Sequence, residues 1–164
     1  MKDVIFVFGL LFMMVPSTHA VDEEDIQTDT TTLATGFPIH IYTPGKVNPD
    51  LTKEVICSPK FRTENYRKVS LQTKKDVFDE YKVSWKDHDK YEVDHLIPIE
   101  LGGSNSIYNL WPEAYDPRPG AHEKDIVENY LHKQVCDGVM PLNQAQDFIA
   151  HDWYQIYKEI EGVE

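Results

Sequence analysis

Apolar residues recur at helical spacing in the last third of the chain. Between Gly120 and Cys136 they fall three and four positions apart, which places Val127, Tyr130, Leu131 and Val135 on one helix face. Asp137-Gly138 then supplies the stop that ends this helix. A last helix is predicted after Pro141, with an inward face made of Phe148, Ile149, Trp153, Ile156, Tyr157 and Ile160. We expect these aromatic residues to belong to the core and not to a base-stacking surface.

A shorter helix is predicted before the middle of the chain. Ser70 is a suitable N-cap, and the residues that follow it to about Val83 place Val77, Phe78 and Tyr81 on one face. Residues 36–59 combine turn residues with short apolar pieces, a mixture typical of extended segments joined by turns. Residues 85–89 form a polar connector.

The middle of the chain predicts a β-hairpin. Tyr91 to Asp94 is expected to be a strand, and Ser106 to Leu110 its partner. Gly102-Gly103 fits the connection because glycine tolerates positive φ. Pro112 to Pro119 contains three prolines and is expected to be an irregular loop. The order strand, turn, strand, helix predicts a single α+β domain over residues 36–164, with additional helices flanking the hairpin and its helix.

The N-terminus has the pattern of a secretory signal peptide. Residues 4–15 are almost wholly apolar, Lys2 precedes them, and small and polar residues lead to Ala20. We predict cleavage after Ala20 and export to the medium or a periplasm, without a stable membrane anchor, because the apolar run is short for a bilayer. A buried N-terminal helix is the alternative. Residues 21–35 are acidic and poor in large apolar residues, which predicts a flexible leader.

Export changes the interpretation of the only two cysteines. In an oxidising compartment Cys57 and Cys136 would most simply form one disulfide. This bond would close a loop of about 80 residues and stabilise the fold by roughly 4 kcal/mol in the chain-entropy model. Two free buried thiols are the alternative if the chain is not exported.

The charge distribution bears on the kind of partner. The net charge of the chain is −12, which repels a polyanion. Residues 53–90, however, contain ten basic and seven acidic residues, whereas residues 113–164 contain four basic and eleven acidic residues. The basic stretch could hold phosphates, or it could be a solvated face of mixed charge.

Residues 91–113, YEVDHLIPIELGGSNSIYNLWPE, carry the candidate chemistry. The spacing of Asp94, His95, Pro98, Gly102, Gly103, Asn109 and Leu110 resembles the front half of the HNH nuclease motif, DHIxPxxxGGxxxxxNL. The resemblance implies a ββα-metal core, in which a short hairpin and a helix surround one divalent ion. Residues 57–153 also resemble small exported HNH-type proteins that share DHLIPxELGGSN, NLWP, LHxxVC and AQxxIxxDW.

The resemblance implies separate roles for three of these residues. His95 would be the general base, because an imidazole titrates near pH 6.5 and is largely free to accept a proton at neutral pH. Asp94 would bind the metal through carboxylate oxygen. Asn109 would hold the loop and orient His95. Adjacent strand residues point to opposite sides, so a strand end at Leu96 would be needed for both to serve one site. An ordinary surface salt bridge is the alternative for the Asp-His pair.

The third element of the motif departs from the family. Many members carry CxxCH with a metal-binding histidine on the helix, and the corresponding residues 119–125 contain no cysteine. His122 is the first choice for the second metal ligand, with Asp125 and Glu128 as alternatives. Lys124 is expected to contact phosphate, with a solvated lysine as the alternative. An exposed histidine is the alternative for His122.

This resemblance, together with the predicted signal peptide, implies an exported metal-dependent endonuclease that hydrolyses nucleic-acid phosphodiester bonds, with DNA favoured over RNA. Magnesium is the first choice of ion, and zinc, nickel and manganese remain open because Asp and His ligands accept several metals. Two other classes stay open: a non-catalytic exported protein that uses an HNH fold for binding, and a hydrolase of another phosphoester. The sequence names no protein partner.

Overall fold

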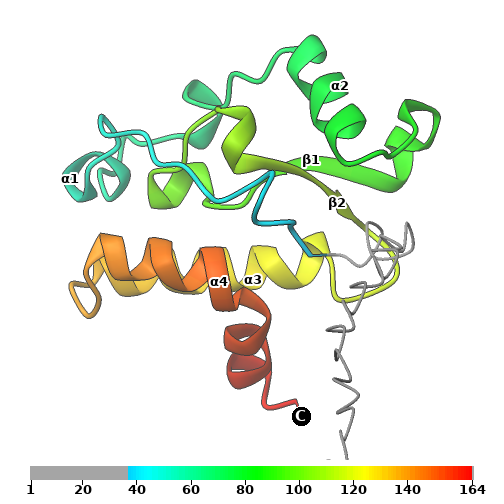
Figure 1. Ribbon diagram of the computed structural model, residues 1–164. Coiled ribbons are helices and arrows are strands. Elements are labelled where there is room, and N and C mark those ends of the chain that lie inside the picture. The colour runs from blue at the N-terminus through cyan, green and yellow to red at the C-terminus, as the bar shows by residue number, and fades with distance from the viewer. Residues whose placement is uncertain (1–36, 164) are drawn as a thin grey trace, which may run out of the picture.

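The computed structural model describes residues 37–163 (Figure 1). The predicted signal peptide, residues 1–20, and the predicted acidic leader, residues 21–35, lie outside the described residues. Within the described part of the chain, no helix combines the length and the apolar character needed to cross a membrane.

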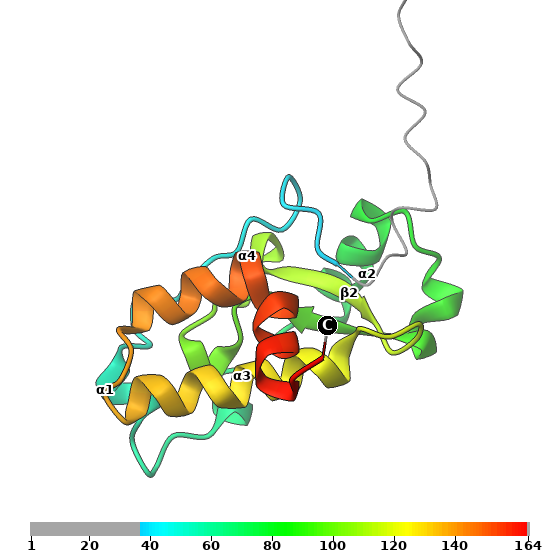
Figure 2. The same cartoon turned by 90° about the horizontal axis from the view of Figure 1, so that it is seen from below.

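A two-stranded antiparallel hairpin lies at the centre of the fold. β1 (Tyr91–His95) pairs with β2 (Leu110–Ala114), so that Tyr91 faces Ala114 and His95 faces Leu110. In Figure 1 the hairpin lies between α2 (Leu71–Glu80) on one side and α3 (Ala121–Cys136) with α4 (Leu142–Glu161) on the other. Figure 2 shows α3 and α4 side by side. The α+β class predicted from the sequence is confirmed.

The predicted partner strand was wrong. Residues Ile107–Asn109 form a 3-10 turn after Ser106, and the strand begins only at Leu110. It continues through Pro112, where the sequence predicted an irregular loop. All five β2 residues are buried, so the alternation that marks a half-buried strand is missing. Proline is tolerated because each strand of a two-stranded sheet is an edge strand.

The predicted helices are confirmed, but the buried face of α3 differs from the predicted one. Ser70 caps α2, its Oγ accepting a hydrogen bond from the Thr73 N–H at 3.0 Å. α3 begins and ends as expected, but Tyr130 is 41 % exposed, while Lys124 and Glu128 are buried. The buried face of α3 therefore includes charged residues, which the spacing of its apolar residues does not predict. The remaining helical elements are α1 (Lys53–Ile56) and 3-10 turns at Thr63–Asn65, Trp85–Lys90 and Ile99–Leu101.

The apolar core lies between the helical layer and the hairpin. Trp111 of β2 and Ile149 and Trp153 of α4 are almost fully buried in it. The other expected inward residues of α4 are half-buried and pack against this core: Phe148, Ile156, Tyr157 and Ile160. α4 bends at Asp152, whose φ of −130° is not helical. The aromatic residues of this helix therefore serve the core, as predicted.

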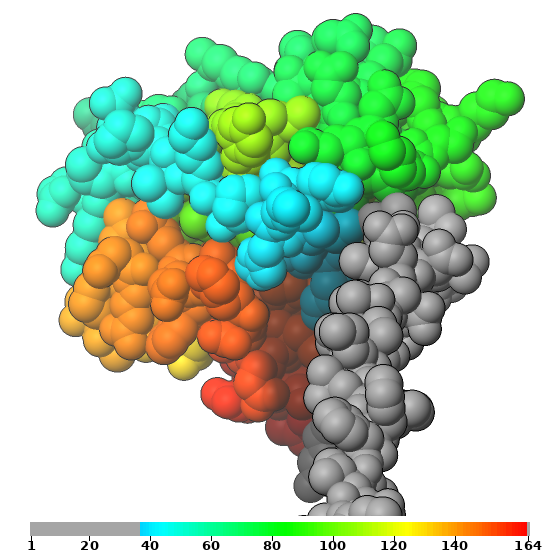
Figure 3. Space-filling view, in the orientation of Figure 1, coloured from blue at the N-terminus to red at the C-terminus, as the bar shows by residue number. Residues whose placement is uncertain are grey.

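Two long-range connections fix the layers. The Cys57–Cys136 disulfide joins the end of α1 to the last residue of α3, which confirms the predicted bond. The segment at residues 37–50 crosses the front of the molecule (Figure 3). Its Gly45 N–H donates to the Tyr108 carbonyl at 3.1 Å, and its Phe37 ring lies 5.4 Å from that of Trp153. The segment thus links the loop between the strands to α4.

Candidate functional site

Asp94 and His95 leave the end of β1 in different directions. The Asp94 carboxylate points to α3 and contacts Lys124, whereas the His95 ring contacts Asn105 and lines a pocket with Arg67 and Lys74. This divergence follows from the alternation of side chains along a strand. Both side chains are buried, so the pair is not a surface salt bridge.

Lys124 is the centre of a buried ionic cluster. Its Nζ donates to Asp94 Oδ2 at 2.6 Å, to the His95 carbonyl at 2.8 Å, and to Glu128 Oε1. The side chain is 0 % exposed, so its ammonium does not face solvent where a phosphate could bind. The expected phosphate contact of Lys124 is therefore replaced by contacts within the protein. The sequence missed this because lysine is rarely fully buried unless it is paired.

The carboxyl groups around Lys124 outnumber the single positive charge of its ammonium group. Burial alone would raise the pKa of Asp94, but the Lys124 ammonium outweighs it and holds that pKa below its ordinary value. Burial raises the pKa of Glu128 to about 8 despite Lys124. Burial also raises the pKa of Glu113 well above its usual range. Asp94 is thus the ionised partner of Lys124, and burial favours the protonated forms of Glu113 and Glu128.

Three carboxyl groups could hold a divalent ion. One oxygen from each of Glu92, Asp94 and Glu113 lies within 4.8 Å of the others. Glu113 is 1 % exposed, and neither of its oxygens has a hydrogen-bond partner among the described residues. A hard cation prefers carboxylate oxygen, and it would satisfy these buried atoms. The donor set therefore fits a magnesium-like ion.

The helix residues considered as second ligand are not part of this carboxylate group. His122 is exposed at the start of α3, with its ring 6.1 Å from that of Tyr115, and it belongs to neither candidate ligand group in the described chain. Asp125 is exposed, and Glu128 is turned inward toward Lys124. Glu92 and Glu113, which the sequence did not single out, become neighbours of Asp94 because they face each other across the hairpin.

The tautomer of His95 is set by Asn105. His95 Nε2 lies 3.1 Å from Asn105 Oδ1, while Asn105 Nδ2 donates to the Tyr66 carbonyl at 2.8 Å. This second bond fixes the amide orientation, so Oδ1 accepts and His95 Nε2 carries the proton. Nδ1 is left as the free acceptor and has no partner among the described residues. Burial lowers the pKa of His95, so the ring is neutral at neutral pH.

Asn109 holds the loop between the strands. Its Oδ1 accepts from the N–H groups of Ile97 and Lys46 at 3.0 and 3.2 Å. Its Nδ2 donates to the carbonyls of Ile97 and Ser104 at 2.9 and 3.0 Å. All four hydrogen-bonding positions of the amide are used, and none contacts the His95 ring. Close packing adds to this restraint, because a Cβ at Gly103 would lie 1.7 Å from the Ile97 carbonyl.

Arg67 connects the histidine side of the site with the carboxylate side. It lines the pocket beside His95 together with Lys74, and it also lines a neighbouring pocket that includes Glu92 and Tyr115. The pocket beside His95 measures about 190 Å³. A water molecule occupies about 30 Å³ of the liquid, so this space can accept a phosphate group. In the sequence, only the basic composition of residues 53–90 indicated that Arg67 and Lys74 would form a positively charged side of this pocket.

No family model matches this chain, and no curated protein or solved structure does so either. The likeness to the HNH family therefore depends on the motif residues themselves.

Proposed function

We propose that this chain is a metal-dependent phosphodiesterase of the HNH kind that hydrolyses nucleic acid, with DNA favoured. The observation that carries the proposal is the state of His95. Asn105 holds its Nε2 proton, its Nδ1 has no partner among the described residues, and Asp94, which precedes it and points to the other side of β1, belongs to a group of three carboxyl groups. A neutral imidazole with one free nitrogen is suited to accept a proton from water.

Glu92, Asp94 and Glu113 would hold the metal ion, with magnesium the first choice and manganese, nickel and zinc open. When bound, the ion would supply a Lewis acid that stabilises the charge developing on the phosphate. Asp94 also contacts the Lys124 ammonium, which keeps its carboxylate ionised and fixed in orientation.

Arg67 and Lys74 would bind the phosphate. An acidic protein with a net charge of −12 needs a local positive surface to hold a polyanion. Both side chains are exposed and line the same pocket as His95. Arginine binds phosphate through two N–H groups at once, which would orient the phosphorus near the imidazole.

The disulfide supports the proposal that the chain is exported, because such bonds persist mainly in oxidising compartments. The proposed destination is the medium or a periplasm, with no protein partner implied.

Cleavage of plasmid DNA and of an RNA of similar length tests the function. The mature protein is incubated with Mg²⁺, Mn²⁺, Ni²⁺ or Zn²⁺, and with EDTA. We expect nicking with at least one metal, none with EDTA, and a loss of about 100-fold or more in His95→Ala, the size usual for a general base. His151→Ala is the matched control, because His151 is an exposed histidine on α4.

Three other results would each contradict part of the proposal. Intact DNA and RNA under all four metals would refute the nuclease function and favour a binding protein, or a hydrolase of another phosphoester if a small phosphodiester is cleaved. Full activity in His95→Ala would remove the assigned base. An unchanged KM in Arg67→Ala would remove the assigned phosphate contact.

A further inference from the structure

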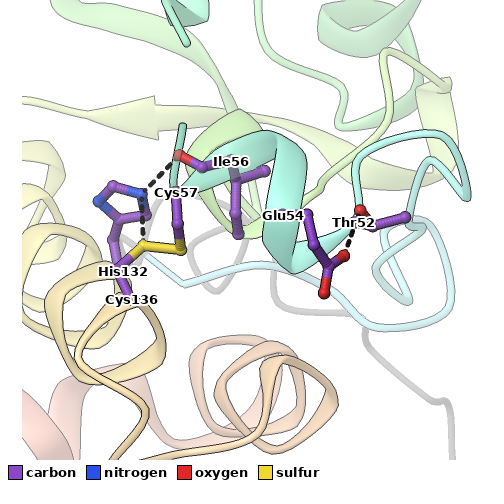
Figure 4. The surroundings of a disulfide bond; sticks show 6 residues. All are labelled: Thr52, Glu54, Ile56, Cys57, His132 and Cys136. Atoms are coloured by element: carbon purple, nitrogen blue, oxygen red, sulfur yellow. Dashed lines mark hydrogen bonds between the residues drawn. A yellow bond between two sulfur atoms is a disulfide. The ribbon is translucent and has the colours of Figure 1, made fainter. Parts of the chain in front are cut away.

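A histidine, His132, lies directly beside the disulfide (Figure 4), in the last two turns of α3. His132 Nε2 is 3.4 Å from the sulfur of Cys136 and 3.2 Å from the carbonyl oxygen of Ile56. The ligand atoms of Cys57, His132 and Cys136 all lie within 4.8 Å of one another. All three residues are half-buried, so a small reductant or a metal ion can reach them.

The spacing matches the needs of a thiophilic metal. Zinc binds thiolate sulfur at about 2.3 Å and imidazole nitrogen at about 2.0 Å in a tetrahedron, which puts sulfur and nitrogen about 3.5 Å apart. The observed distance of 3.4 Å from His132 Nε2 to Cys136 Sγ is already close to this value. The two sulfurs would have to separate to about 3.8 Å once their bond is broken. This change lies within reach of the side chains, because Cys57 follows the last residue of the short helix α1.

The surroundings favour a cation at this place. Cys136 is the last residue of α3, and the carbonyl groups at the end of a helix carry partial negative charge. Glu100 adds a carboxyl group whose Oε1 is buried without a partner among the described residues. Burial raises the pKa of this carboxyl, and the nearby His132 acts in the opposite direction. A metal-bound histidine commonly donates its other ring N–H to a carboxylate, and Glu100 is the candidate for that contact.

We propose that the reduced form of this protein binds one Zn²⁺ ion through Cys57, His132 and Cys136, and that formation of the disulfide releases it. A dithiol reductant breaks the sulfur–sulfur bond, becomes a disulfide itself, and leaves two protein thiols. Zinc then displaces the two thiol protons and binds the thiolates without changing its own oxidation state. This site is separate from the carboxylates near Asp94, and its existence does not depend on the proposed nuclease function.

Redox state would therefore decide which cross-link joins α1 to α3. In the oxidised protein the disulfide makes the connection, and His132 Nε2 donates to the Ile56 carbonyl beside the sulfur of Cys136. In the reduced protein the metal would make the same connection and protect both thiolates from oxidation. The chain would thus keep its two segments together before the disulfide forms.

Cobalt binding tests the site directly, because a Co²⁺–thiolate bond gives a charge-transfer band in the near ultraviolet. The full chain is reduced with a phosphine, treated with chelator, and titrated with Co²⁺ and then with Zn²⁺ in the absence of oxygen. The chain has only two cysteines, so any such band comes from Cys57 and Cys136. We expect one equivalent of Co²⁺ to bind, Zn²⁺ to displace it, and the oxidised protein to give no band.

His132→Ala separates a real site from two nearby thiols. Losing an outer partner of a metal ligand already costs about 10- to 100-fold in affinity, so losing the ligand itself should weaken Zn²⁺ binding by at least about 100-fold. His151→Ala is the control, because this histidine is exposed on α4 and should leave the affinity unchanged. The variant keeps both cysteines, so thermal unfolding of its oxidised form checks that it folds.

Two results overturn the proposal. One is the absence of a thiolate band in the reduced chain, whether that chain is folded or unfolded. The other is equal Zn²⁺ affinity in the reduced wild type and in His132→Ala, which would show that the thiols bind metal without a formed site. Nuclease assays on the oxidised protein are unaffected by either result, so this proposal and the proposed function fail independently.

Discussion

Replacing Lys124 by methionine should destabilise the protein strongly. Methionine keeps most of the side-chain volume but removes the ammonium that contacts Asp94, Glu128 and the His95 carbonyl. The side chain is 0 % exposed, so water cannot replace the lost contacts without opening the core. The Asp94 carboxylate, held ionised by this lysine, would be left buried without a counterion.

The size of the effect follows from the burial of the cluster. Removing one partner of a buried ion pair costs about 3–5 kcal/mol, because the remaining charge stays desolvated. For a chain of 164 residues, 1 kcal/mol corresponds to roughly 3–4 °C in Tm, which gives a loss of about 10–20 °C. The deficit should shrink as the pH falls, because burial raises the pKa of Asp94 once Lys124 is removed, and the protonated carboxyl no longer needs a cation.

Thermal unfolding followed by circular dichroism at pH 7 measures this loss. Lys133→Met is the matched control, because Lys133 also lies on α3 and also pairs with a carboxylate four residues later, but its side chain is 71 % exposed. Exposed pairs of this kind contribute about 0–1 kcal/mol, so the control should lose only a few degrees. A Lys124→Met protein whose Tm lies within about 3 °C of the control would refute the buried cluster.

Further changes test the charge states and the restraints around the site. Asp94→Asn should cost about 3–5 kcal/mol in the free energy of unfolding, whereas Glu128→Gln should cost less than about 1 kcal/mol. The reason is that, of these two residues, only Asp94 is ionised at pH 7. Similar losses of the two variants in urea unfolding would contradict this assignment. Glu128 has a pKa raised to about 8 from 4.5, so its contribution is complete below pH 4.5 and is lost as the pH rises through 8. Urea unfolding with EDTA should show this decline in the wild type and a smaller one in Glu128→Gln. Asn109→Ala should cost about 3–4 kcal/mol, since four hydrogen bonds of the amide are lost, and a Tm within a few degrees of the wild type would refute its structural role. Reducing the Cys57–Cys136 bond in metal-free protein should cost about 4 kcal/mol, measured by urea unfolding with and without reductant.

The sequence predicted the elements whose signals are local. The caps and apolar spacing of α2, α3 and α4 gave their extents, because residues three and four apart on a helix meet regardless of the rest of the fold. Two cysteines in a chain with a predicted signal peptide were enough to predict their disulfide. The motif placed Asp94 and His95 at the end of a strand, which is where β1 ends.

Tertiary structure decided what the residues near Asp94 do. The register of the hairpin set Glu113 opposite Glu92, and a buried proline-containing strand gave no alternating pattern from which to predict it. Packing of α3 against β1 turned Lys124 inward and left His122 at the surface. The sequence by itself therefore determined the helices, the first strand and the disulfide, whereas only the fold decided which carboxylates meet and which charges are buried. The physical reason is that burial of a charge depends on counterions from distant segments, and no local pattern records them.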